Sequence, residues 1–209
     1  MRQAADGRMD TKPYRAAAVG LVLLAGLVCG LAGCGSGGGD DGGVIGDPIT
    51  ASFTPSGTVS SPDLVRLTGN ASNDLVTLQV VIAGQTTSVD LFAFAFDLVL
   101  SNVALVGYID GSEEFGTALT LGAGQSGVAL AQQTADRVTV GVTKLGGAGN
   151  GVGPGEKTIV TLQFRVMAKG TGTIAIDTAP PAEPGAEESD GAAAPGVTFD
   201  GLPALISGS

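Results

Sequence analysis

Short apolar runs, in which hydrophobic and polar positions alternate, make up most of the chain after residue 48. Residues 75–82, LVTLQVVI, place an apolar side chain at every second position, and residues 89–98, 137–143, 158–168 and 172–177 repeat the pattern. Successive side chains of a strand point to opposite faces of a sheet, so this period of two predicts strands with one buried face. The predicted inward residues are Val76, Leu78, Val80, Ile82, Phe92, Phe94, Phe96, Leu98, Val138, Val140, Val142, Val160, Leu162, Phe164, Val166, Ile174 and Ile176.

Shorter apolar runs separated by Gly, Asn, Asp and Pro predict further strands. They lie at 49–54, 103–109, 117–121, 127–132 and 197–206. No amphipathic helix is predicted. About ten short strands, each with one apolar face, need a second sheet to cover them, so the pattern predicts an all-β protein with a two-sheet β-sandwich.

Two segments have the composition of loops. Residues 146–156 are too rich in glycine for a regular element. Residues 180–196 are acidic and rich in Pro and Ala, which predicts a long surface loop before a last strand, because VTFDGLPALI follows.

The first 48 residues have a different composition. Residues 16–33 contain no charged side chain and follow a mildly basic stretch. Leu31-Ala32-Gly33-Cys34 resembles a bacterial lipobox, where a peptidase cuts before a cysteine that carries lipid. We therefore predict a signal peptide at 1–33, lipidation of Cys34, and a Gly-rich tether at 34–48. An uncleaved N-terminal anchor with a chance cysteine is the alternative.

A lipid anchor predicts a cell-envelope protein whose domain lies in the periplasm or outside the cell. Gly35 follows the cysteine in place of the aspartate that resembles an inner-membrane retention signal, which favours the outer membrane in a diderm source. Because two or more acyl chains anchor a protein stably, no membrane-spanning segment is needed.

The charge and residue content exclude several classes of function. With 10 basic and 20 acidic side chains, the chain has a net charge of −10, which argues against binding nucleic acid. Histidine is absent, and of the two cysteines Cys29 lies in the predicted signal peptide and Cys34 carries the lipid. His-based triads, His metal ligands and thiolate chemistry are thereby excluded. We expect no enzyme, no catalytic residue, no metal site and no cofactor.

The remaining candidates for chemistry are weak. Asp110, Glu113 and Glu114 in YIDGSEEFG are a dense carboxylate cluster, yet a solvated turn explains them better than glycoside hydrolysis or calcium binding. Tyr108 is more typical of a sandwich edge than of a sugar-stacking platform. Gly155-Glu156-Lys157-Thr158 leads into a strand, whereas a phosphate-binding loop is followed by a helix.

Over roughly residues 49–207, the order of elements resembles a cohesin-type domain, a β-sandwich of the carbohydrate-binding-module-like superfamily. The resemblance rests on LVTLQVVIAG, on FAFAFD at 92–97 followed by YIDG, and on GVGPGEKTIVTLQFRVMAKGTGTIAI. Phe96-Asp97 matches the aromatic-Asp-Pro step of the family, with Leu98 in place of the proline. The resemblance implies a jelly-roll-like sandwich of about nine strands.

Cohesins bind dockerins on the outer face of one sheet, which includes the third strand. On this chain, the resemblance assigns Val89, Leu91, Ala93, Ala95 and Asp97 to that face. Coverage of this apolar set by a neighbouring loop is the alternative. We therefore expect a non-catalytic, lipid-anchored binding module for a protein partner, dockerin-like or other. A carbohydrate-binding lipoprotein that serves polysaccharide capture or breakdown is the second hypothesis.

Overall fold

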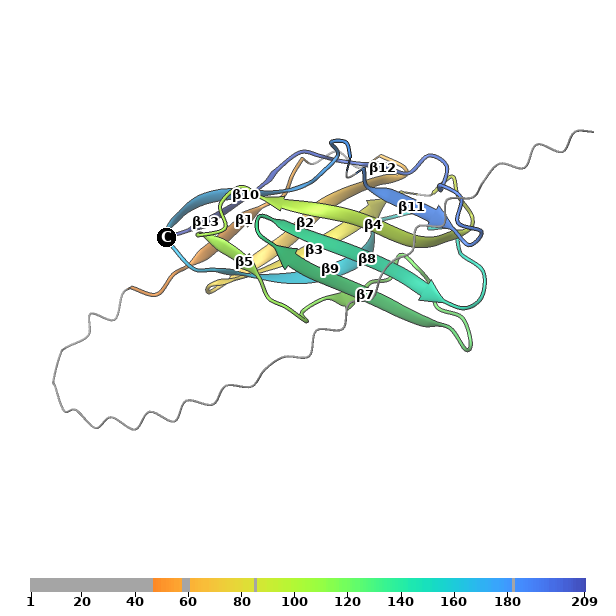
Figure 1. Ribbon diagram of the computed structural model, residues 1–209, viewed down its shortest axis with the longest axis horizontal. Helices are drawn as coiled ribbons and strands as arrows, with labels where there is room; N and C mark the ends of the chain where they lie inside the picture. The colour runs from red at the N-terminus through yellow and green to blue at the C-terminus, as the bar shows by residue number, and fades with distance from the viewer. Residues whose placement is uncertain (1–46, 58–60, 85, 182) are drawn as a thin grey trace, which may run out of the picture. The chain divides into compact units, whose positions relative to one another are not determined.

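The computed structural model describes residues 47–209 except 58–60, 85 and 182. In these residues thirteen strands form two sheets, of seven and six strands, which pack face to face (Figure 1). The predicted signal peptide, Cys34 and nearly all of the tether lie outside the described residues. Within the described part of the chain, no helix has the length and hydropathy needed to cross a membrane.

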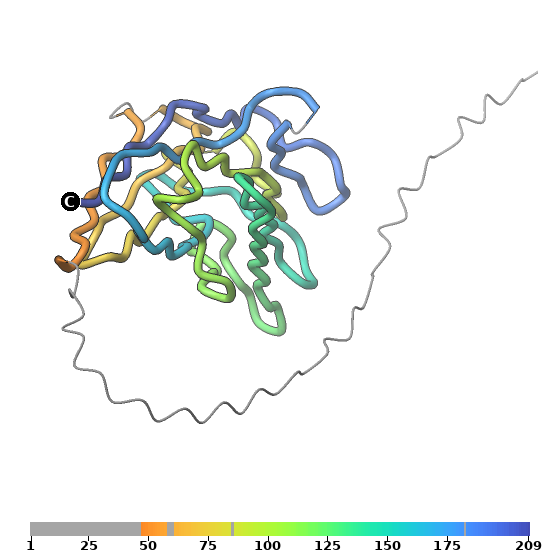
Figure 2. Tube along the Cα trace, turned by 60° about the vertical axis from the view of Figure 1, so that its left-hand side comes forward, coloured from red at the N-terminus to blue at the C-terminus, as the bar shows by residue number. Residues whose placement is uncertain are grey.

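The seven-stranded sheet, called sheet A, is antiparallel throughout. Its order is β1 (Ala51–Thr54), β13 (Ala204–Gly208), β10 (Gly170–Ile176), β4 (Leu91–Leu100), β8 (Arg137–Leu145) and β7 (Ser126–Thr134), with β11 (Gly185–Glu188) also paired to β4. On the side of β4 away from β8, β10 pairs with residues 98–100 and β11 with residues 91–95. The C-terminal residue Ser209 exchanges backbone hydrogen bonds of 3.1 Å with Thr50, so the described chain starts and ends side by side (Figure 2).

The six-stranded sheet, called sheet B, covers the inner face of sheet A. Its order is β12 (Thr198–Phe199), β2 (Leu64–Ser72), β3 (Leu75–Ala83), β9 (Lys157–Val166) and β5 (Val106–Tyr108), with β6 (Glu114–Phe115) also paired to β9. Asn73 and Asp74 connect β2 to β3, and Asn73 has a φ of 55°, a left-handed conformation in which asparagine is enriched.

The alternating side chains form the core between the sheets. With the exception of Phe92, every residue predicted to point inward is buried. These buried residues of the alternating pattern belong to one hydrophobic cluster within residues 45–209, which form one compact unit. A large aliphatic or aromatic side chain taken out of water contributes roughly 1.5–3 kcal/mol, so this unit has a core of its own.

A β-bulge explains why Phe92 differs. Ala93 lies opposite Glu187 and Leu91 opposite Glu188, so Phe92 is one extra residue on β4. An extra residue breaks the period of two, and Leu91 therefore points into the core with the side chains of Phe94 and Phe96.

Three other predictions need correction. The strand β2 was not predicted, because Arg66, Gly69 and Asn70 interrupt its apolar pattern. The predicted strand at 117–121 is irregular, and the short β6 precedes it. The predicted loop at 180–196 contains β11. The two-sheet sandwich is confirmed, with more strands than the predicted nine because several have only two to four residues.

Candidate partner-binding face

The outer face of sheet A is the surface that the sequence predicts to bind a partner, and small residues form its centre. Leu130 on β7, Gly141 on β8, Ala95 on β4 and Gly185 on β11 lie opposite one another in one row across four strands. A Cβ atom added to Gly141 or Gly185 would meet nothing within 4 Å. The backbone of this row is therefore open to close approach by another molecule.

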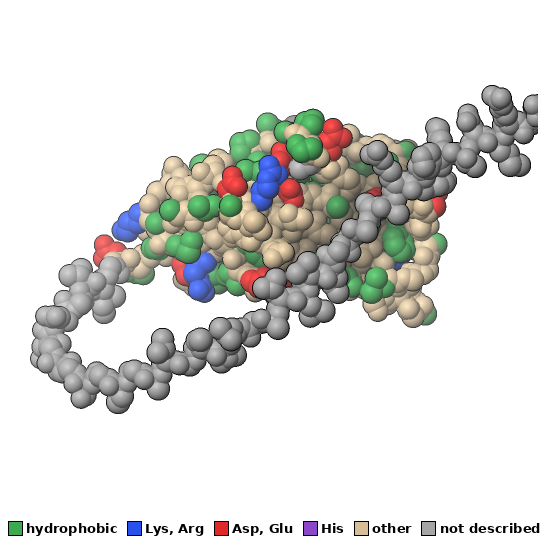
Figure 3. Space-filling model, viewed as in Figure 1, with side chains coloured by type: hydrophobic (Ala, Val, Ile, Leu, Met, Phe, Trp, Pro, Cys, Tyr) green, Lys and Arg blue, Asp and Glu red, His purple; other side chains and the backbone are tan. Residues whose placement is uncertain are grey.

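Short and uncharged side chains dominate the rows on either side. These rows contain Val128, Thr143, Ala93 and Glu187 on one side, and Gln132, Thr139 and Asp97 on the other. Figure 3, seen from the side where β4, β7 and β8 lie in front in Figure 1, shows a surface that is mostly tan and green with few charged side chains. The face is thus weakly polar and sparsely charged at its centre.

Two shallow hollows open on this face, and Thr139 lines both of them. The first, of about 510 Å³, is also lined by Asp110, Leu130, Ala131, Gln132 and Gly141. The second, of about 190 Å³, is also lined by Ala95, Phe96, Asp97, Val140 and Glu183. Asp110 and Glu183 place one carboxylate beside each hollow, so the surroundings of the uncharged centre are acidic.

An ion-pair cluster marks one end of the face. Arg137 Nη1 on β8 lies 3.1 Å from Asp97 Oδ2 and 2.5 Å from Asp177 Oδ2. These two carboxylates raise the pKa of Arg137, with Asp177 contributing most. The pKa of Asp177 is lowered, first because the Ala179 N–H donates a hydrogen bond to it and second because Arg137 does. Asp97 is therefore engaged within its own sheet, and its side chain is only 18% exposed.

The structure brings together three of the five residues assigned to this face. Ala93, Ala95 and Asp97 alternate along the outer side of β4, and Ala95 is exposed. Val89 is 79% exposed but precedes the strand. The assignment of Leu91 is wrong, because the bulge at Phe92 turns its side chain into the core, where it is fully buried.

The segment around β11 extends the sheet and leaves Ala95 uncovered. The Ala194 N–H donates a hydrogen bond of 2.8 Å to the Ala186 carbonyl, which closes a hairpin over residues 185–194. Ser88 Oγ donates to Glu188 Oε1 at 2.8 Å, which fixes the hairpin to the chain that enters β4. The alternative was that a neighbouring loop covers the outer face of β4. Among the described residues, no loop covers Ala95, which is exposed.

A second contact fixes the β11 hairpin. Ser189 Oγ donates to Asp90 Oδ2 at 2.5 Å, and this hydrogen bond is the main reason that the pKa of Asp90 is lowered. The Gly149 N–H donates to the other carboxylate oxygen at 2.6 Å. Asp90 thereby joins the hairpin to the glycine-rich loop that follows β8.

Lys144, at the end of β8, is 2% exposed and holds the same loop from inside. Its Nζ donates to the Ala148 carbonyl at 2.8 Å and to Asn150 Oδ1 at 3.3 Å. The Asn150 Nδ2 in turn donates to the Ala118 carbonyl at 3.1 Å. Several hydrogen bonds therefore hold the loop at residues 146–156 in place, and its glycine-rich composition predicts none of these hydrogen bonds.

The carboxylates of YIDGSEEFG do not converge on a catalytic or metal-binding arrangement. Asp110 is exposed, Glu113 accepts a hydrogen bond from the Tyr108 hydroxyl, and Glu114 lies in β6. Among the described residues, no group of three or more His, Cys, Asp or Glu is placed to hold a metal ion.

Tyr108 is a packed edge residue. Its ring meets Phe164 edge to face, with 5.6 Å between ring centroids. Burial, and next the hydrogen bond to the Glu113 carboxylate, raises the pKa of Tyr108 to about 12. In the described part of the chain the aromatic side chains are buried or partly buried, and none is fully exposed.

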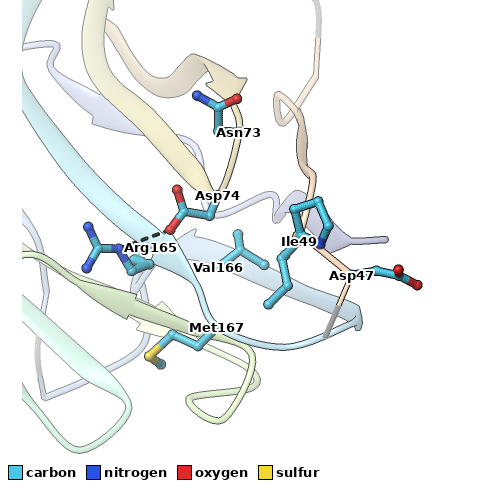
Figure 4. A pocket seen from close by; sticks show the side chains of 8 residues that line it. Asp47, Ile49, Asn73, Asp74, Arg165, Val166 and Met167 are labelled. Atoms are coloured by element: carbon cyan, nitrogen blue, oxygen red, sulfur yellow. Dashed lines mark ion pairs between the residues drawn. The ribbon is translucent and has the colours of Figure 1, made fainter. Parts of the chain in front are cut away.

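Another hollow, of about 590 Å³, lies away from this face (Figure 4). Figure 4 shows the side chains of Arg165 and Asp74 directed toward one another, while that of Asp47 points away from both. Arg165 Nε lies 3.2 Å from Asp74 Oδ2, and both side chains are substantially exposed. Arg165 and Asp74 thus pair with each other, whereas Asp47 Oδ2 lies 3.9 Å from Lys169 Nζ, so the charges in this hollow do not converge on a common point.

The sequence analysis missed the residues that other strands contribute to the face. The positions Thr139, Gly141 and Thr143 follow from the alternation at 137–143, but their pairing with β4 does not. No feature of the sequence indicated that Gly185 lies in a strand of this sheet, because its segment has the composition of a loop.

No model of a known protein family and no curated protein matches this sequence. Similar solved structures include a non-cellulosomal cohesin from Archaeoglobus fulgidus, 13% identical over 74% of this chain and 87% of that chain, with a TM-score of 0.41. A type II cohesin domain from the cellulosome of Acetivibrio cellulolyticus is 12% identical over 75% of this chain and 94% of that chain, with a TM-score of 0.44. A cohesin module from a Clostridium perfringens family 33 glycoside hydrolase is 11% identical over 75% and 96%, with a TM-score of 0.42. All three are cohesin modules, the family that the sequence resembles.

Proposed function

We propose that this chain is a non-catalytic, lipid-anchored binding module of the cell envelope, which presents the outer face of sheet A to a protein partner. The observation that carries the proposal is the open row of Leu130, Gly141, Ala95 and Gly185. Extended, weakly polar and well-supported surfaces of this kind suit a protein interface, whereas small-molecule sites are usually concave and enclosed.

The charges around the face indicate the chemistry of the partner. Asp110 and Glu183 border the two hollows. Arg137, the cation that pairs with Asp97 of these rows, is also paired with Asp177, so its charge is already neutralised. A partner with a small apolar centre and Lys or Arg at its rim would be complementary. The sequence resemblance to cohesins makes a dockerin-like module the first candidate.

The lipid anchor is supported by the sequence alone. Cys34 follows Leu31-Ala32-Gly33, and about 15 Gly-rich residues separate it from β1. A flexible chain of that length has a root-mean-square span of about 20 Å, which leaves the sandwich free to meet a partner above the membrane.

Polysaccharide capture is the second candidate, and the packing of the aromatic residues disfavours it. A flat polysaccharide surface is bound by exposed aromatic rings that stack on its sugars, whereas a protein interface does not need such rings. Because Tyr108 is engaged with Phe164 and Glu113, it does not offer a free ring.

The class of partner is tested by capture on immobilised residues 45–209 from envelope fractions and culture supernatant of the source organism, with and without EDTA, beside a panel of insoluble polysaccharides. A captured protein that is lost with EDTA supports a dockerin-like partner, because dockerins fold around calcium. A captured protein that resists EDTA supports another protein partner. Retention on a polysaccharide with no captured protein contradicts the proposal in favour of the carbohydrate-binding alternative.

A further inference from the structure

The edges of the two sheets are unequal. Sheet A ends at β1 with 4 residues and at β7 with 9, whereas sheet B ends at β12 with 2 and β5 with 3. Edge strands carry unpaired backbone groups that can pair with another chain, and proteins limit this by keeping such strands short, bulged or charged. The strands β6 and β11, which pair outside these two orders, have 2 and 4 residues. Every edge strand except β7 therefore obeys that rule through its length.

The sequence of β7 also lacks the other protective features. Residues 121–135 contain no Asp, Glu, Lys, Arg or Pro. The register of β7 with β8 runs from Ser126 to Thr134 without a shift, so no bulge twists the edge away. Among the described residues, the backbone of β7 pairs with β8 alone. The strand thus carries no charged residue of its own, and its outer edge has no backbone partner among the described residues.

Contacts near the two ends of β7 hold the strand in place. A Cβ added to Gly127 would lie 2.6 Å from the Phe115 ring, so that ring packs directly against the strand. Near the other end, the Tyr108 N–H donates to Gln133 Oε1 at 2.8 Å. The strand is therefore ordered in advance, which lowers the entropic cost of pairing.

We propose that two copies of this chain pair edge to edge along β7, antiparallel and centred on Leu130. The chain has a net charge of −10, so charge repulsion opposes the association of two copies, and β7 is the long edge strand that carries none of these charges, with Asp110 as the carboxylate beside Leu130. Leu130 is the middle residue of β7 and is 64% exposed. Pairing about this residue brings the two Leu130 side chains together.

The same pairing matches the remaining outward residues. Val128 of each copy falls opposite Gln132 of the other, and Ser126 opposite Thr134, with no charged pair in the register. Residues opposite each other in an antiparallel pair lie on the same side of a sheet. The outer faces of both copies would therefore face the same way, and two partner-binding faces would form one continuous surface suited to bivalent binding.

The association is tested by sedimentation equilibrium of residues 45–209 from micromolar to millimolar concentration, with no partner present. The wild-type domain is expected to reach twice the monomer mass. Leu130→Lys should weaken dimerisation by about tenfold or more, because it places like charges directly opposite each other. The control is Leu205→Lys on β13, which changes another leucine of the same face, 47% exposed, and should leave the dimer unchanged. Circular dichroism confirms that each variant is folded.

Disulfide trapping tests the register. Both cysteines of the chain, Cys29 and Cys34, precede residue 45, so Leu130→Cys provides the sole thiol of the domain. Mild oxidation should give a covalent dimer with Leu130→Cys and none with Leu205→Cys. A wild-type monomer at millimolar concentration, a dimer that withstands Leu130→Lys, or equal trapping at both positions overturns the proposal. A monomer that pairs β7 with an added extended peptide overturns it as well.

Discussion

Ala95 on β4 lies directly opposite Gly141 on β8, so an alanine and a glycine meet at the centre of an outer sheet face. The residues beside them in sequence, among them Phe94, Phe96, Val140 and Val142, are large and buried. The strands are thus held firmly from within, while their outer surface stays low and open. This combination gives a rigid surface that a partner can meet with little loss of conformational entropy.

The ion-pair cluster makes stability depend on pH in the acidic range. The folded state lowers the pKa of Asp177 below its usual value of 3.8, so its contribution is present above that value and is lost as pH falls through the folded pKa. We expect the stability of residues 45–209 to fall below about pH 4, and less steeply in Asp177→Asn. Urea unfolding at a series of pH values measures this. Parallel profiles of the two proteins would show that Asp177 is not coupled to folding.

The buried lysine is expected to be structural. Lys144→Met keeps the length of the side chain but leaves the Ala148 carbonyl and Asn150 Oδ1 without its hydrogen bonds, which should cost about 1–3 kcal/mol. Thermal and urea unfolding measure the loss, and hydrogen exchange should increase at residues 146–150. Lys157→Met, at an exposed position of β9, is the matched control and should stay within about 0.5 kcal/mol of the wild type. Equal effects of the two changes would refute the role of Lys144.

The packed aromatic pair gives a prediction for the core. Phe164→Ala removes a fully buried ring and its edge-to-face contact with Tyr108, and should destabilise the domain by about 3–5 kcal/mol. The midpoint of urea unfolding reports the change. Leu205→Ala, on the exposed side of β13, should have little effect. A small loss for Phe164→Ala would mean that the sheets are not packed as described.

The predicted lipid anchor has a direct test. Cys34→Ser should abolish attachment of lipid to the full-length protein, while the circular dichroism of the purified domain stays unchanged. Fractionation and metabolic labelling with a fatty acid measure the outcome. Wild-type protein that carries no label, or a mutant that carries as much label as the wild type, would contradict the lipobox interpretation.

Local alternation was enough to predict the sandwich, because one buried face per strand leaves a period of two in the sequence. The same rule failed at Leu91, since a bulge depends on the partner strand and leaves no mark in the pattern of β4. It also gave no hint of β11, whose place beside β4 rests on hydrogen bonds such as that from Ser189 to Asp90. The candidate site was therefore predictable along β4 only from Ala93 to Asp97, and it was unpredictable across the strands.

The central claim, that the outer face of sheet A binds the partner, is tested most directly by arginine substitution at its centre. Once capture has yielded a protein partner, its affinity for the wild-type domain is compared by calorimetry with that for Ala95→Arg and Gly141→Arg. The control is Asn70→Arg, at an exposed outer position of sheet B. We predict at least about a hundredfold loss of affinity for both sheet A variants, through steric exclusion at the centre of the interface, and none for the control. Undiminished binding by the sheet A variants, or an equal loss with Asn70→Arg, would contradict the account.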